Sequence, residues 1–290
     1  MNNKLNNMIN DFMANSDAKD MKELNEQLQE FIKKYNAGEI EYKKTALDSA
    51  YELLEKAENT KSKHQAIKYA KEAYKMCSAC FDAIILQAEL EDNPLKKIKL
   101  LEEGLKNEKN RLIGEKFFEK DNIGSFYSIF ETRPYIRGLR VKVEYLINDG
   151  KIKQARDVCK EILRLNKSDN IGARYLLMAI YAYLEDENEI LKLYKKYPEE
   201  DLEMLFPIFA LYYKIGNDKK AKEYLNRINK ANPHFIKIFK NTIKENRTVP
   251  DGYYTKGDSS EVLMYFSVYF FLIITMPNIS YYVLENSKKN

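Results

Sequence analysis

Three pairs of residues in the second half of this 290-residue chain recur at a single spacing of 66 positions. The pairs are Gly150 and Gly216, Ala155 and Ala221, and Asn166 and Asn232. Half of this spacing is about 33 residues, the length of the helix-pair units that stack into repeat proteins. The sequence therefore predicts stacked helix pairs here, each burying its apolar faces against its neighbours.

The recurring residues have physical roles in such a unit. In the last unit, Gly216 supplies a left-handed residue that ends the first helix, and Pro233 stops the second helix from continuing. Ala221 is small, which suits a close approach of the two helices. The middle unit, at residues 173–184 and 189–197, is degenerate because residues 185–188 read Glu-Asp-Glu-Asn where a Gly turn is expected.

Composition favours helices along the rest of the chain as well. Only 10 Gly and 7 Pro are present, whereas strands, hairpins and phosphate-binding loops depend on such turn residues. Charged residues make up 32% of the chain, as in amphipathic helices with solvated outer faces. Apolar residues also follow a helical spacing through residues 21–35, 46–57 and 66–77. We therefore predict an all-α fold class.

These marks resemble the tetratricopeptide repeat, with Gly216 at its turn, Ala221 at the small residue of its second helix and Pro233 at its terminal Pro. The resemblance implies an α-solenoid of tetratricopeptide-like helix pairs wound as a right-handed superhelix. It also implies a non-enzymatic scaffold or adaptor that mediates protein–protein interaction.

Four strings resemble a narrower family, the bacterial tetratricopeptide proteins related to the eukaryotic suppressor-of-tumorigenicity-seven proteins. They read Gly-Ser-Phe-Tyr at 124–127, Glu-Thr-Arg-Pro-Tyr-Ile-Arg at 131–137, Leu-Arg-Leu-Asn-Lys-Ser-Asp-Asn at 163–170 and Asn-Pro-His at 232–234. Residues 257–261 and the aromatic helix expected after them resemble that family's C-terminal end, and the resemblance covers roughly residues 46–284. Many relatives have Gly-Phe-Trp where this chain has Ser-Phe-Tyr at 125–127, and they commonly have Pro where this chain has Lys167. The family implies a helical adaptor and no chemistry that can be assigned to single residues.

The pattern divides the chain into five predicted segments. Residues 1–40 form an N-terminal helical segment, 41–108 tetratricopeptide-like helix pairs, 109–132 an aromatic insertion, 133–250 further repeats, and 251–290 a C-terminal capping helix and tail.

Motifs for catalysis are absent from the sequence. No Gly-rich phosphate loop and no nucleophile or zinc-protease motif is present, so we expect no enzyme activity, metal or cofactor. A weaker alternative places an enzyme site in the aromatic insertion, near Glu115, Glu119 and Asp121.

The mild net charge of +4 gives no reason to expect a nucleic-acid partner. Few cysteines and a polar N-terminus without an apolar signal segment favour a cytoplasmic location.

One cysteine motif carries two interpretations. Cys77 and Cys80 have the spacing of half a zinc site or of a redox pair, but no second Cys or His pair lies at a suitable spacing. The alternative is two small apolar residues at a helix junction.

Acidic pairs such as Glu199-Glu200 are expected on solvated faces.

A peptide-binding groove is the main functional hypothesis from the sequence. Aligning the last three units places eight residues on the concave face of the first helices: Arg137, Arg140, Arg174, Met178, Tyr181, Phe206, Tyr213 and Lys214. Arg side chains bind carboxylates with paired hydrogen bonds, so the groove is expected to bind an acidic or C-terminal peptide of an unidentified protein. The alternative is that these Arg side chains form salt bridges within the chain, for example with Glu144.

Residues 262–284 carry no charge, and this stretch has two interpretations. A repeat array needs a terminal helix to cover its last apolar face, and Asp258 or Ser259 would cap such a helix with Glu261 in its first turn. The alternative is a membrane-tethered adaptor that uses this stretch as an anchor or an interfacial helix. Pro277 interrupts the stretch, which favours the buried capping helix.

Overall fold

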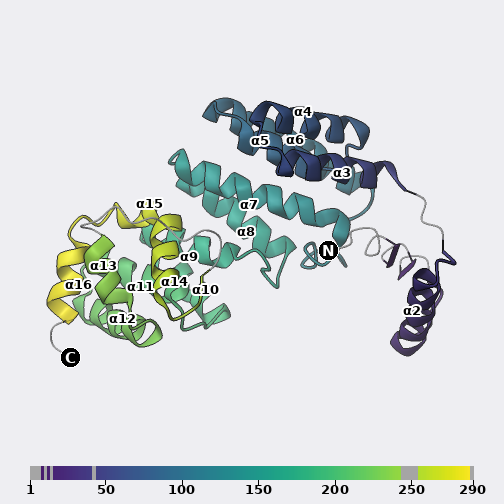
Figure 1. Ribbon diagram of the computed structural model, residues 1–290. Helices are drawn as coiled ribbons and strands as arrows, with labels where there is room; N and C mark the ends of the chain where they lie inside the picture. Colours follow the sequence, from purple (N-terminus) through teal and green to yellow (C-terminus); the bar gives the residue numbers. More distant parts are fainter. Residues whose placement is uncertain (1–7, 10–11, 14–15, 41–43, 243–253, 288–290) are drawn as a thin grey trace. The chain divides into compact units, whose positions relative to one another are not determined.

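A computed structural model describes residues 8–9, 12–13, 16–40, 44–242 and 254–287 (Figure 1). Within these residues the chain is all-helical and contains no strand, and the helices pack mainly on their neighbours in sequence. This confirms the predicted all-α class. The chain divides into two compact units, residues 1–97 and 98–290, and the division falls inside helix α6 (Pro94–Gly114). The predicted segment boundaries at 41 and 251 lie outside the described residues.

The first unit contains α2 (Met21–Asn36), α3 (Ala46–Asn59), α4 (Lys63–Met76), α5 (Asp82–Leu90) and the start of α6. Helix α3 begins with a capping box, in which Thr45 accepts from the Asp48 N–H and Asp48 accepts from the Thr45 N–H. Helices α3, α4 and α5 share a core of small and apolar residues, namely Ala50, Leu54, Ala73, Cys80 and Ala83. Helix α2 buries none of its own residues, and its Phe31 ring stacks on Phe12 at 4.6 Å between centroids.

The second unit contains three consecutive helix pairs. They are α7 (Arg133–Asn148) with α8 (Ile152–Leu165), α9 (Ala173–Leu184) with α10 (Glu187–Lys196), and α11 (Leu202–Lys214) with α12 (Asp218–Ala231). The first helices α9 and α11 also pack on each other, as do α8 and α9 (Figure 1). These bounds agree closely with the helices expected from the 66-residue spacing. Ala155 and Ala221 are fully buried, as their small size predicts for a close helix approach.

The turn inside each pair has the same backbone conformation. Gly150 and Gly216 have φ of 71° and 74°, which confirms the predicted left-handed residue. In the degenerate middle unit Glu185 takes this place, with φ of 60°. A residue with a Cβ is strained in the left-handed region of φ and ψ. The middle unit therefore keeps the left-handed turn although it lacks the Gly that favours this conformation.

The aromatic insertion packs on the repeats through its rings and its backbone. Helix α6 continues to Gly114, so the irregular stretch starts after that residue, and it leads to a short 3₁₀ helix η1 (Phe130–Thr132). Phe118 contacts Phe126 and Tyr135 edge-on, at 4.9 and 5.9 Å between centroids. The insertion also joins the turn after α8, because the Gly124 N–H donates to the Leu165 carbonyl at 3.0 Å and the Lys167 N–H donates to the Gly124 carbonyl at 2.9 Å.

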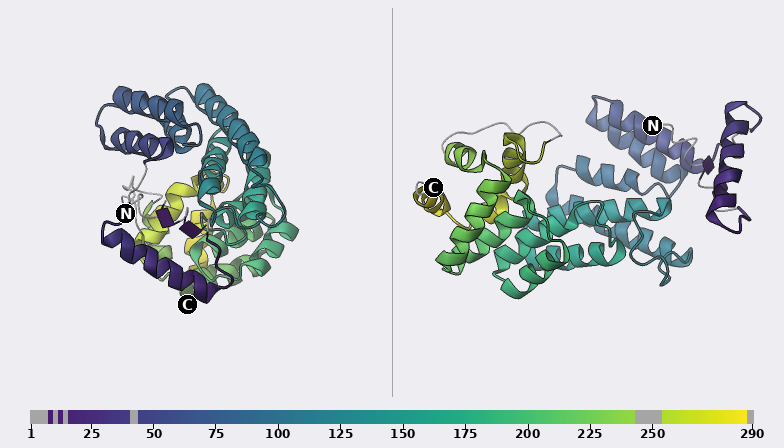
Figure 2. Two further views of the ribbon diagram at one scale, coloured as in Figure 1. Left: turned by 90° about the vertical axis from the view of Figure 1, so that its right-hand side faces the viewer. Right: turned by 90° about the horizontal axis from the view of Figure 1, so that it is seen from below.

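The C-terminal region forms three helices after α13 (Phe235–Thr242), where the sequence predicted one. They are α14 (Ser259–Val268), α15 (Phe270–Ile273) and α16 (Ile279–Ser287), and they pack against α9, α11 and α13 (Figure 2). Asp258 caps α14 by accepting from the Ser260 N–H at 2.7 Å, as expected. Among the described helices, none is both long enough and apolar enough to cross a bilayer.

The left-handed turn of the middle unit generates a stability prediction. Glu185→Gly should raise the free energy of unfolding by about 1 kcal/mol, because Gly adopts a positive φ without a Cβ clash. The contact between Glu185 and Lys214 is lost, but the Glu185 side chain is half-exposed and its ion pair contributes little. Urea unfolding followed by circular dichroism measures the change.

Gly216→Ala is the matched control, because it places a Cβ at the equivalent turn. It should lower the free energy of unfolding by about 1 kcal/mol. A loss of stability in Glu185→Gly would contradict the assignment of strain to this turn.

Candidate functional site

The eight predicted groove residues separate by burial. Met178 and Phe206 are 0% exposed and Tyr181 is 2% exposed, so these three side chains lie in the core and do not line an open groove. The Tyr181 hydroxyl reaches Glu189 of the paired helix α10 at 3.3 Å, which shows that this side chain faces its own partner helix. These three residues therefore lie on a different stripe of their helices from the predicted one. The other five residues are partly exposed.

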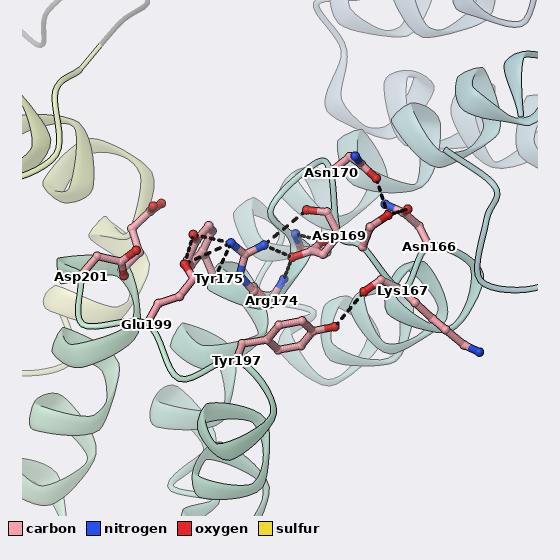
Figure 3. A network of polar contacts seen from close by, with 12 residues as sticks. Asn166, Lys167, Asp169, Asn170, Arg174, Tyr175, Tyr197, Glu199 and Asp201 are labelled. Atoms are coloured by element: carbon pink, nitrogen blue, oxygen red, sulfur yellow. Dashed lines mark hydrogen bonds and ion pairs between the residues drawn. The ribbon is translucent and has the colours of Figure 1, made fainter. Parts of the chain in front are cut away.

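Arg174 is held by the turn that precedes its own helix (Figure 3). Its Nη1 donates to Asp169 Oδ2 at 2.9 Å, and the backbone N–H groups of Ala173 and Arg174 donate to the same carboxylate at 2.7 and 2.9 Å. Asp169 is buried and has a left-handed φ of 49°. Its carboxylate therefore caps α9 and neutralises Arg174 at the same time.

The other side of the Arg174 guanidinium contacts the turn between α10 and α11. The distance from Nη2 to a Glu199 oxygen is 3.0 Å, and the Tyr175 hydroxyl donates to the same carboxylate at 2.7 Å (Figure 3). The guanidinium also lies over the Tyr175 ring, 4.0 Å from its centroid, and 5.6 Å from that of Tyr197. Arg174 thus connects the turns before α9 and before α11, which is the salt-bridge alternative of the sequence analysis.

Burial shapes the electrostatics of this network. The Arg174 side chain is 14% exposed and the Asp169 side chain is fully buried. Burial raises the pKa of Asp169, although hydrogen bonds from the backbone and side chain of Arg174 oppose the shift. The pKa of Glu199 is lowered against the effect of burial, because Tyr175 and Arg174 hydrogen-bond to its charged form. Neither carboxylate is a simple solvated group.

The remaining basic residues differ in how firmly they are held. The Lys214 amine donates to the carbonyls of Ala182 and Tyr183 at 3.2 and 2.7 Å, so it caps the C-terminus of α9. Arg140 pairs with Glu144 one turn along α7, and the side chain of Glu144 is 52% exposed. Arg140 also lies close enough to Tyr269 that its positive charge counters the burial that raises the pKa of that hydroxyl.

The aromatic end of the predicted groove is covered by the chain's own C-terminal helices. The rings of Phe206 and Tyr265 lie 5.0 Å apart, and those of Tyr213 and Tyr282 lie 5.1 Å apart. We call the surface formed by the first helices α7, α9 and α11 the A-helix face. Helices α14 and α15 pack on its α11 and α9 portions, and Tyr282 of α16 reaches the α11 portion as well.

Carboxylates missed by the sequence analysis fix this C-terminal segment in place. Glu203 accepts from the hydroxyls of Tyr254 and Tyr269, both at 3.0 Å, and burial raises its pKa. The Lys256 amine donates to the neighbouring Asp201 at 2.7 Å. No local pattern in the sequence signals these contacts, because each joins residues more than fifty positions apart.

Comparisons with known proteins leave the chain without an assigned family. No protein-family model matches it, and no curated protein is detectably similar to it. Across the described residues, no group of three or more His, Cys, Asp or Glu side chains is arranged to hold a metal ion.

The Asp169–Arg174 pair generates a prediction about stability. Arg174→Met should lower the free energy of unfolding by about 3 kcal/mol, because it leaves a buried carboxylate without its cation. Adding Asp169→Asn should recover part of this loss, since Asn still accepts from the helix N–H groups and tolerates a left-handed φ. A double-mutant cycle from urea unfolding measures the coupling.

The control is Arg156→Met, because Arg156 pairs with an exposed Asp157 on α8. It should change stability by no more than about 0.5 kcal/mol. Additive effects of Arg174→Met and Asp169→Asn would contradict the coupling.

Proposed function

We propose that this protein is a non-enzymatic scaffold that works in the cytoplasm by binding another protein. In this proposal the helix pairs form a tetratricopeptide-like α-solenoid wound as a right-handed superhelix. Their sequential packing and the shared left-handed turns support it. Membership of the family related to the suppressor-of-tumorigenicity-seven proteins is part of the proposal. Its support is that the strings at 124–127 and 163–170 hydrogen-bond to each other.

One observation carries the binding proposal. The A-helix face already holds a polypeptide segment, since residues 254–287 contact α11 through ring contacts and tyrosine–carboxylate hydrogen bonds, and α15 packs on α9. A surface that packs against an aromatic segment of its own chain, most of it uncharged, offers ring contacts and hydrogen-bond partners that a peptide could use. We propose that a partner binds beside this segment, at the α7 end.

The α7 end offers a cation that can exchange its partner. Arg140 is 22% exposed and pairs with the half-exposed Glu144 one turn along the same helix, and i,i+4 pairs on helices contribute only about 0.3–0.5 kcal/mol when they are solvent-accessible. Arg137 lies one turn earlier and is also partly exposed. Arg174, in contrast, is enclosed between two carboxylates. A partner's acidic side chain or terminal carboxylate would therefore replace Glu144 at Arg140 rather than disturb Arg174.

An array of synthetic peptides tests this proposal. Sequences with and without acidic residues carry either a free or an amidated C-terminus, which separates acidic from C-terminal recognition. We expect the full chain to bind one of these classes, and Arg140→Glu to weaken that binding about tenfold or more, since a charge-assisted pair is lost.

Arg156→Glu is the matched control on α8, where Arg156 is also paired and partly exposed. It should leave the affinity unchanged. Equal binding of all peptide classes, or equal losses in the two variants, would contradict recognition at α7.

A second candidate function is attachment to a membrane surface. The observation that favours it is a group of apolar side chains exposed on the uncharged C-terminal segment, with Val268 at 41%, Phe270 at 60% and Ile274 at 58%. Apolar and aromatic side chains of this kind insert into the interfacial region of a bilayer.

Sedimentation with phosphatidylcholine vesicles tests this second candidate. The full chain should sediment with the vesicles, and the double variant Phe270→Ser and Ile274→Ser should stay in solution. Ile215→Ser, which changes an exposed Ile after α11, is the control and should still sediment. If the unmodified chain stays in the supernatant, membrane attachment through this segment is excluded.

A further inference from the structure

The turn between α4 and α5 places two cysteines at its ends. Cys77 is the C-cap of α4 and is partly exposed, whereas Cys80 is fully buried. The Cys80 N–H donates to the Cys77 carbonyl at 3.0 Å, so residues 77–80 form a four-residue turn. The first and last Cα atoms of such a turn lie within about 7 Å of each other.

The two side chains also point toward the same core. Cys80 belongs to the cluster with Ala50, Leu54 and Ala73, and Cys77 packs against that cluster from its edge. A disulfide requires Cα atoms about 4.4–6.8 Å apart and side chains directed toward each other. The short turn brings the two Cα atoms close to this range, and both side chains contact the same cluster.

We propose that Cys77 and Cys80 form a reversible disulfide site, which is oxidised by small-molecule disulfides of the glutathione class. The Cys77 thiol loses its proton to water, and the thiolate attacks one sulfur of the small disulfide. A protein–small-molecule disulfide forms, and one small thiolate leaves. The Cys80 sulfur then attacks the Cys77 sulfur, its proton passes to the departing sulfur, and the second small thiol leaves. Two protein thiols are oxidised, one small disulfide is reduced to two thiols, and the number of electrons balances.

The difference in burial sets the order of the two steps. Access to solvent governs which thiol reacts with an external reagent, so the partly exposed Cys77 reacts first. The buried Cys80 then meets the activated sulfur within the turn. The resulting bond would join the end of α4 to the residues just before α5, and would fix the connection between two successive helices of the first unit.

Cys159 provides an internal control in the same chain. It is buried on α8, and burial raises the pKa of its thiol to about 12. Burial keeps external reagents away from it, and no partly exposed cysteine stands within a turn of it in the sequence to form a mixed disulfide beside it, as Cys77 does beside Cys80. It should therefore remain reduced under conditions that oxidise the turn.

The experiment equilibrates the full chain in a series of glutathione redox buffers under native conditions. The samples are quenched with acid, alkylated after unfolding, digested and analysed by mass spectrometry. We expect a peptide joining Cys77 and Cys80 that is lighter by two hydrogens than its reduced form. Cys159 should be alkylated throughout.

Two variants separate the steps. Cys80→Ala keeps a small buried side chain and should accumulate glutathione on Cys77, whereas Cys77→Ser should leave Cys80 unmodified. Circular dichroism checks that both variants fold, and the unmodified chain provides the decisive measurement in any case. Alkylation of both Cys77 and Cys80 across the whole buffer series would overturn the proposal, as would a mixed disulfide on Cys77 that persists in the unmodified chain.

Discussion

The close approach of paired helices at small side chains is the constraint on which the rest of the structure depends. Ala50 and Ala73 in the first unit, and Ala155 and Ala221 in the second, are all fully buried. A larger residue at these positions would push the two helices of a pair apart and would open the core between neighbouring pairs. The left-handed turns, the helix caps and the aromatic contacts all depend on this close approach of the two helices in each pair.

The equivalent turns after the second helices each secure another segment of the chain, one through a side chain and one through the backbone. Asn232 donates to the Asp258 carbonyl at 2.8 Å and to Glu261 at 2.7 Å, so it anchors the start of α14. At the equivalent turn, the backbone around Asn166 pairs with Gly124 of the aromatic insertion. In both units the turn that follows the second helix secures a segment from elsewhere in the chain. The repeat therefore organises its non-repeating parts as well.

The sequence predicted the features that depend on local signals. Gly150 and Gly216 marked turns, Asp258 marked a helix start, and the apolar spacing marked the helices, because each signal acts within a few residues. Side-chain placement across helices was harder to predict. Met178 and Tyr181 lie one stripe away from the predicted face, since a small error in helix alignment rotates a residue from surface to core.

The part of the candidate site that escaped prediction depends on long-range contacts. Glu203 is partly buried and accepts hydrogen bonds from Tyr254 and Tyr269, and no sequence pattern near Glu203 predicts those partners. Arg174 was expected to face a ligand, but its carboxylate partners come from two different turns. Charged residues that flank helices of a repeat are therefore ambiguous in sequence, because neighbouring units supply counter-ions as readily as a ligand does.

The order in which the chain is synthesised gives the C-terminal helices a further importance. Phe206, Phe235 and Phe239 are buried together with Tyr265 and Phe266, which lie on α14. During translation the first three of these side chains emerge before the segment that covers them. Until α14 is made, the growing chain carries an uncovered aromatic surface, the kind of surface that chaperones bind and that drives aggregation. Helix α14 therefore covers an aromatic surface that the preceding helices alone leave open.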